Sequence, residues 1–266
     1  MTSSNLLRER RGAVLLLTLN RPETHNALDH DLLAALGDAV AGAARSGDVR
    51  AVVVTGAGER AFSAGADLRE LAEMGLEAAR ATIDQGQAVL AVIESCGLPV
   101  IAAVNGLALG GGFELALACT FPVLSTSARL GLPESSLGLM PGFGGTQRLP
   151  RMVGPAVAAH VMLTGARLDA ARSFDLGLSP VPPVEPEQLL DTSLELARTI
   201  AAQGPRAVRS ILGALRLVPD TSQADGLVAE AGLAAGCIAG EESGEGITAF
   251  LEKRPAQYAD LPGDDR

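Results

Sequence analysis

Residues 99–118 read PVIAAVNGLALGGGFELALA, and this stretch decides the fold. The apolar run 100–104 predicts a strand buried on both faces, because it lacks polar alternation. Asn105 ends the strand, and three consecutive glycines, Gly110–Gly112, then lead into an apolar helical pattern. Glycines let the backbone approach a bound group, and the first turn of a helix has unpaired, partly positive N–H groups. With Glu114 in that turn, the pattern indicates either a binding site or an ordinary helix start.

A second helix start lies in residues 61–70, AFSAGADLRE. Asp67 and Glu70 have the spacing of a capping box with Asp67 as the cap, so we expect a helix to begin there. Gly65 can adopt a positive φ, and Ala66 then presents its N–H group near the helix start. The ordinary alternative is a strand-to-helix turn. A second glycine-supported helix start that matches the first is what favours a functional interpretation.

Composition limits the classes of function. The chain has 266 residues, of which 47% are hydrophobic, and this predicts a globular α/β protein with room for one large domain. Its net charge of −10 argues against nucleic acid as a partner. Lys253 is the sole lysine and lies outside any glycine-rich loop, which argues against a phosphate-loop NTPase and against a Schiff-base enzyme.

The spacing of cysteine and histidine residues gives no reason to expect a metal site. The three cysteines form no CxxC pair, and the three histidines lack ligand spacing. Scattered cysteines also suit a reducing cytoplasm. The N-terminus lacks the long apolar region of a signal peptide, and Asn105, Glu114 and several glycines interrupt the most apolar stretch. We therefore expect a cytoplasmic protein without a membrane-spanning segment.

Strands and helices alternate along the first part of the chain. Residues 14–19 and 49–55 predict strands on either side of a helix that Asp29 caps, which is typical of layered α/β architecture. Residues 140–147 form a second glycine-rich loop. This loop fails the dinucleotide-binding pattern GxGxxG because Gln147 stands where the last glycine would be, and the chain has no GxSxG nucleophile elbow.

A proline-rich connector divides the chain. Residues 179–186 contain four prolines and predict a rigid segment. We therefore expect an α/β core over residues 1–184 and a C-terminal helical oligomerisation region over residues 185–266. The helices expected in that region cover 189–202, 205–215, 226–239 and 241–253.

The chain resembles the enoyl-CoA hydratase/isomerase (crotonase) superfamily through short segments in the order in which the family has them. They are LNRP at 19–22, NAL at 26–28, AFSAGADL at 61–68, AAVNGLALGGGFE at 102–114, GLPE at 131–134, PGFGGTQRL at 141–149 and AFLEKR at 249–254. Each segment is weakly specific, whereas the ordered set is highly specific. The resemblance implies a crotonase-like spiral of ββα units with a C-terminal helical trimerisation region, and assembly as a trimer or a dimer of trimers.

The resemblance also implies an active site for acyl-CoA thioesters. The backbone N–H groups of Ala66 and Gly111 would hold the thioester oxygen as an oxyanion hole, which stabilises charge that develops there. Glu114 and Glu134 would share one water molecule, with Glu114 as the base and Glu134 as the donor to C2. We expect the helix-start field to favour the ionised form of Glu114, and a raised pKa at Glu134 would require apolar surroundings.

Binding of the coenzyme A part of the substrate is implied for further positions. Gly142 would close over the water and the glutamates, and Lys253 would offer positive charge to the phosphates, or else be an ordinary solvated charge. The residues implied to line the coenzyme A channel are Ala27, Ala64, Asp67 and Leu68. No separate cofactor is expected, since coenzyme A enters as part of the substrate.

Several departures from the family pattern affect binding rather than chemistry. Thr24 stands where the family often has a basic residue that touches coenzyme A, so Arg21 or Arg60 would have to supply that charge. Phe113, before the first glutamate, would narrow the acyl pocket.

The pair of carboxylates favours hydration of a trans-2-enoyl-CoA to a 3-hydroxyacyl-CoA. The alternatives left open are isomerase, hydrolase or decarboxylase chemistry on the same fold, and a non-catalytic binding protein, including one that binds RNA.

Overall fold

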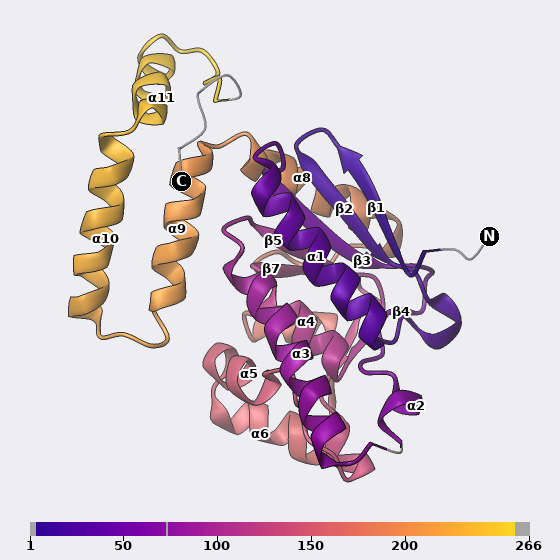
Figure 1. Cartoon of the computed structure of the whole chain (residues 1–266). Coiled ribbons are helices and arrows are strands. Elements are labelled where there is room, and N and C mark those ends of the chain that lie inside the picture. Colours follow the sequence, from indigo (N-terminus) through magenta and orange to yellow (C-terminus); the bar gives the residue numbers. More distant parts are fainter. Residues whose placement is uncertain (1–3, 73, 259–266) are drawn as a thin grey trace.

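Strands without any exposed residue form the centre of the fold. The computed structural model describes residues 4–72 and 74–258 (Figure 1). Its larger sheet has the order β1-β2-β3-β5-β7, in which β1 is antiparallel to β2 and the other neighbours are parallel. Every residue of β3 and β5 is buried, as the continuous apolar runs predict for covered parallel strands. The strands are β1 (Leu6–Arg11), β2 (Val14–Leu19), β3 (Ala51–Gly56), β5 (Val100–Val104) and β7 (Phe121–Leu124).

A second, smaller sheet has the order β4-β6-β8-β9. After β3, each turn of the chain adds one strand to each sheet and then a helix, and this repeat is the expected spiral of ββα units. The successive turns are β3-β4-α2-α3, β5-β6-α4 and β7-β8-η2-α5. Their remaining members are β4 (Ala61–Ser63), β6 (Leu107–Leu109), β8 (Arg129–Gly131), α2 (Leu68–Leu71), α3 (Leu76–Ser95), α4 (Gly111–Ala118), the 3₁₀ turn η2 (Glu134–Leu137) and α5 (Gly145–Val153).

Helices cover both faces of the larger sheet, because alternate strand residues point to opposite sides. Leu15 and Leu17 of β2 face a core shared with α1 (His30–Ser46) and α3. Val14 and Leu16 face a smaller core closed by α8 (Leu189–Ala201). The other elements are η1 (Pro22–Thr24), α6 (Pro155–Thr164), β9 (Arg167–Asp169), α7 (Ala170–Asp175) and η3 (Pro186–Gln188).

Three C-terminal helices form an arm beside this body: α9 (Pro205–Leu217), α10 (Gln223–Ile238) and α11 (Glu241–Leu251) (Figure 1). The arm leaves large apolar side chains uncovered, among them Val228 and Phe250, which are 75% and 82% exposed. The division of the chain at residue 184 stays a prediction, and α8, just beyond it, packs on the sheet rather than in the arm. None of the described helices is long and apolar enough to cross a lipid bilayer.

Two details differ from the sequence-based expectations. Strand β1 was not predicted from the sequence. Five of its six residues are exposed, and its sequence, LLRERR, lacks the alternation of apolar and polar residues that is typical of a half-buried strand. The expected capping box is only half formed: Asp67 accepts from the N–H of Arg69 and caps α2, whereas the Glu70 carboxylate accepts from the N–H of His30 at 3.2 Å. Glu70 therefore links α2 to α1 instead of closing its own helix start.

Asn26 fixes the segment that follows β2 and is fully buried. Its side-chain oxygen accepts from the Arg21 N–H at 3.0 Å, and its amide donates to the Ala57 and Ala61 carbonyls at 3.0 and 2.8 Å. Its φ of 56° is in the left-handed region, which asparagine tolerates better than most residues. One side chain thereby connects the loop before α1 to the loop between β3 and β4.

We predict that Asn26→Ala lowers the free energy of unfolding by about 3 kcal/mol, because the Arg21 N–H and the Ala57 carbonyl lose their partner and the Ala61 carbonyl keeps only the longer hydrogen bond from Asn105, at 3.3 Å. Urea-induced unfolding would measure the change. Gln203→Ala, at an exposed position, is the control and would change stability by less than about 0.5 kcal/mol. An equally small change in Asn26→Ala would contradict the structural role given to this residue.

Candidate active site

The turn between β4 and α2 leaves one backbone donor unused. Gly65 has a φ of +101°, and its carbonyl accepts from the Leu28 N–H at 2.8 Å. The Asp67 N–H donates to the Leu28 carbonyl at 3.1 Å. Leu28 therefore engages the residues on both sides of Ala66, while the Ala66 N–H stays out of this pairing.

The turn between β6 and α4 has the same property. Gly110 has a φ of +51°; its N–H donates to the Gly131 carbonyl at 2.9 Å, and its own carbonyl accepts from the Glu114 N–H at 2.9 Å. Gly111 begins α4, so its N–H precedes the hydrogen-bonded part of the helix. Both helix starts singled out in the sequence thus present a backbone donor.

The two donors lie close together. A Cβ atom added to Gly65 would be 3.2 Å from the Gly111 nitrogen, and one added to Gly111 would be 3.4 Å from the Ala66 nitrogen. Within residues 4–72 and 74–258, neither amide donates a hydrogen bond to another residue. Backbone N–H groups without a partner are rare in folded proteins, so two of them side by side indicate a place for an anionic or carbonyl oxygen.

Glu114 lies on α4 and is 1% exposed. Its Oε1 atom accepts from the N–H groups of Phe143 at 2.9 Å and Gly145 at 2.7 Å. The pKa of Glu114 is raised to about 7: burial is the largest cause and the charge of Glu134 adds to it, whereas the amides of Gly145 and Phe143 and the charge of Arg148 act in the opposite direction. The helix-start field was expected to favour the ionised form of Glu114, but loss of hydration outweighs that field and leaves the pKa above its ordinary value.

Glu134 begins η2 directly after Pro133, at the edge of the same space. A Cβ atom added to Gly110 would be 3.1 Å from Glu134 Oε1, and Glu134 Oε2 is buried without a hydrogen-bond partner. Burial raises the pKa of Glu134, which agrees with the apolar setting that its expected role requires. Two carboxyl groups with raised pKa values are suited to take up and give up protons in a reaction.

The glycine-rich loop before α5 closes over Glu114. We expected Gly142 to do so, but the donors are Phe143 and Gly145, and the Gly142 carbonyl points to Gln87, whose side chain donates to it at 2.8 Å. The Phe143 ring fills the space over Gly86, where an added Cβ would lie 2.2 Å from it. The glycine-rich pattern predicted a loop at the site, but no sequence signal specifies which of its amides point inward.

The expected coenzyme A residues lie in two places. Ala27, Ala64, Asp67 and Leu68 belong to the segments around the Leu28–Ala66 bridge, next to the free Ala66 amide. Ala64 and Leu68 are exposed there, whereas Ala27 is buried. Lys253 follows α11 in the arm, which Figure 1 shows away from α2 and β4, so one chain does not bring Lys253 to the glutamates.

Arg21 is not free to replace the missing basic residue at Thr24. Its guanidinium pairs with Asp29 at 3.1 Å and Asp67 at 3.0 Å, and donates to the Ala27 carbonyl at 2.7 Å. The three charged side chains are 11–15% exposed. Arg21 therefore braces the turn that carries Ala66, and Arg60, which is exposed, remains the expected source of positive charge. Phe113 is buried in the core shared with α1 and α3, and its expected role in narrowing the acyl pocket stays a prediction.

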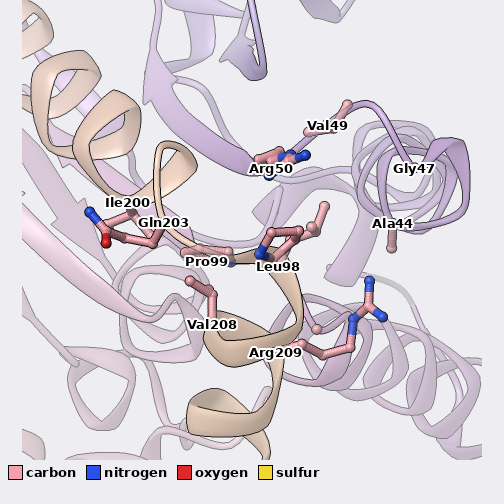
Figure 2. A pocket seen from close by; sticks show the side chains of 12 residues that line it. Ala44, Gly47, Val49, Arg50, Leu98, Pro99, Ile200, Gln203, Val208 and Arg209 are labelled. Carbon is pink, nitrogen blue, oxygen red and sulfur yellow. The ribbon is translucent and has the colours of Figure 1, made fainter. Parts of the chain in front are cut away.

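A separate hollow lies where α9 joins the body, and Figure 2 shows Leu98 and Pro99 in its middle. It has about 30 Å³ of space, enough for a single water molecule. Val49 and Pro99 place it before the starts of β3 and β5, whereas the glutamates follow the ends of parallel strands, where ligands of such sheets bind. Among the described residues, no three His, Cys, Asp or Glu side chains come together to hold a metal ion.

A two-sheet ββα spiral followed by C-terminal helices is the crotonase fold. The sequence pattern of the enoyl-CoA hydratase/isomerase family matches residues 9–261, and the chain belongs to this family. It is 40% identical to a crotonyl-CoA hydratase of Syntrophomonas wolfei, over 97% of this chain and 99% of that protein. It is 42% identical to a 2,3-dehydroadipyl-CoA hydratase of Escherichia coli, over 96% and 98% of the two chains.

A solved structure gives the same result. The crystal structure of an enoyl-CoA hydratase from Bacillus anthracis superposes with a TM-score of 0.93 at 38% identity, covering 97% of this chain and 100% of the other. The two chains therefore share the fold along nearly their whole length.

We predict that the carboxyl carbon of Glu114 titrates with a pKa of about 7 in the free protein. In Glu134→Gln this pKa would fall, because the substitution removes a negative charge that disfavours ionisation of Glu114. NMR of protein labelled with ¹³C at glutamate carboxyl groups would measure both titrations. An ordinary pKa near that of exposed glutamate, unchanged by the substitution, would contradict the geometry described above.

Proposed function

We propose that this chain is an enoyl-CoA hydratase that adds water across the 2,3 double bond of a trans-2-enoyl-CoA to give a 3-hydroxyacyl-CoA. One observation carries the proposal: two unused backbone amides, the buried Glu114 and the half-buried Glu134, which come from three separate segments, meet in one place. The full-length similarity to crotonyl-CoA and 2,3-dehydroadipyl-CoA hydratases supports the same reaction class. The reacting centre is a conjugated thioester, whose carbonyl oxygen becomes negative when water attacks C3.

The amides of Ala66 and Gly111 are proposed as the oxyanion hole for this oxygen. They cost no reorganisation during the reaction, because Leu28 and Gly131 already hold the two turns in place. One donor of this type contributes about 3 kcal/mol to stabilisation of the transition state. The apolar surroundings strengthen the interaction, since little water competes for the amides.

The two glutamates are proposed to move the protons. Ionised Glu114 takes a proton from water while the water oxygen bonds to C3, and protonated Glu134 gives its proton to C2. Return of a proton from Glu114 to Glu134 through solvent restores both groups. A pKa of about 7 suits Glu114 to this task at neutral pH, because a useful fraction is ionised and still basic.

Substrate binding and assembly complete the proposal. Coenzyme A, as part of the substrate, would lie along Ala27, Ala64, Asp67 and Leu68, with Gly142 near the acyl end. Lys253 would reach the phosphates of a ligand in a neighbouring chain, since the uncovered apolar side chains of the arm suit a trimer or a dimer of trimers. The three free thiols suit work in the cytoplasm, and no cofactor is proposed.

We predict that Glu114→Gln and Glu134→Gln each lower kcat for crotonyl-CoA hydration about 10³-fold, as expected for removal of a proton-transferring group. Absorbance of the conjugated thioester would follow the rate, and mass spectrometry would identify the product. Glu59→Gln, at an exposed site between β3 and β4, is the control and would keep the activity. Near-normal turnover in Glu114→Gln or Glu134→Gln would contradict the proposal.

We predict that Gly65→Ala lowers kcat about 100-fold, because the methyl group would lie 2.8 Å from the Leu109 carbonyl and push the two donors apart. Gly12→Ala is a matched control. Gly12 also has a positive φ, +67°, but an added Cβ meets nothing within 4 Å, so this variant experiences the backbone strain alone. Equal losses of activity in both variants would show that strain, and not displacement of the amides, is responsible.

A further inference from the structure

Gln87 reaches the candidate site through a single peptide group. Its side-chain amide donates to the Gly142 carbonyl at 2.8 Å. That carbonyl and the Phe143 N–H belong to the same peptide group, and the Phe143 N–H donates to Glu114 Oε1 at 2.9 Å. Gln87 on α3 and Glu114 on α4 therefore hold opposite ends of one peptide group.

The planarity of the peptide gives this arrangement a mechanical consequence. The C=O and N–H bonds of a trans peptide point in opposite directions and cannot rotate independently. A turn of the group that moved its carbonyl away from Gln87 would also move its N–H away from Glu114. Hydrogen bonds in such a chain also polarise one another, so donation by Gln87 makes the Phe143 N–H a better donor.

The rest of the loop has other supports. The Phe143 carbonyl, in the next peptide group, accepts from Arg148 at 2.8 Å, and Arg148 is held by Glu94 at 2.9 Å. Arg148 also acts on Glu114 through its charge. Gln87 is neutral, and the contact given above is its one side-chain hydrogen bond among the described residues. Substitution of Gln87 therefore isolates the effect of orienting the peptide from the effect of adding or removing charge.

We propose that Gln87 is a positioning residue that orients the Gly142–Phe143 peptide and so stabilises the ionised form of Glu114. Its effect on rate rests on the proposed function, whereas its effect on Glu114 does not. The other groups that act on Glu114 are the Gly145 N–H, the carboxyl group of Glu134 from η2 and the guanidinium of Arg148 from α5, and none of them contacts Gln87.

Loss of the Gln87 donor is expected to raise the pKa of Glu114. Gln87→Leu removes the donor while keeping an apolar side chain of similar size, so the ionised form of Glu114 loses support and its pKa rises. At pH 7 less of the base is ionised, and kcat/KM falls about fivefold, the size of one ordinary hydrogen bond. The deficit shrinks as the pH rises to 9, where Glu114 ionises in both proteins. KM for crotonyl-CoA stays close to that of the unsubstituted protein.

The experiment compares three variants of the full chain. Gln87→Leu is the test and Gln87→Lys retains a donor. Gln85→Leu is the matched control, because Gln85 lies on the same helix and donates to the His30 carbonyl at 3.1 Å, away from the glycine-rich loop. The pKa of Glu114 is measured by ¹³C NMR without substrate, with Glu114→Gln to assign the signal, and kcat/KM for crotonyl-CoA is measured between pH 6 and 9.

In Gln87→Leu alone we expect a higher pKa of Glu114 by NMR and a higher pKa for the fall of kcat/KM at low pH. In Gln87→Lys both pKa values are expected to equal those of the unsubstituted protein or to lie below them. An unchanged pKa in Gln87→Leu, or the same rise in Gln85→Leu, would overturn the proposal. If the unsubstituted protein does not hydrate crotonyl-CoA, the proposed function fails, and the NMR titration still decides the role of Gln87.

Discussion

The structure around the site depends on a carboxyl group that is kept out of water. Glu114 is 1% exposed, and its two amide partners come from a loop that follows it by 29 and 31 residues. Burying a carboxylate is costly unless hydrogen bonds replace its water, so the loop, the helix and the carboxyl group must be ordered together. This requirement explains why α4 packs against α5 and the loop that precedes it.

Close approach of backbones is the second constraint. A Cβ atom at Gly112 would lie 2.2 Å from the Ser63 carbonyl, and one at Gly86 would overlap the Phe143 ring. These contacts bring α4 against β4 and the loop against α3, and they leave no room for any other residue. The ββα repeat supplies the framework, while glycines at a few crossings set how tightly its turns pack.

Much of the fold could be predicted from the sequence, because the core strands are continuous apolar runs and Asp29 caps its helix as expected. Two backbone donors could be placed at Ala66 and Gly111 because glycine and helix-start patterns are local. The inward amides of Phe143 and Gly145, and the contact of Gln87 with the loop, depend on how distant segments pack. The pKa of Glu114 could not be predicted for the same reason, since burial is a property of the whole fold.

The order of the segments along the chain also affects how the protein is made. During synthesis α4 leaves the ribosome before the loop that supplies the amides to Glu114. Until residues 143–145 have emerged, the carboxyl group lacks both of its amide partners, and α4 cannot settle into its final place without burying an unsatisfied carboxyl group. A nascent chain that stops short of this loop would therefore keep its central helix hydrated and accessible to chaperones and proteases.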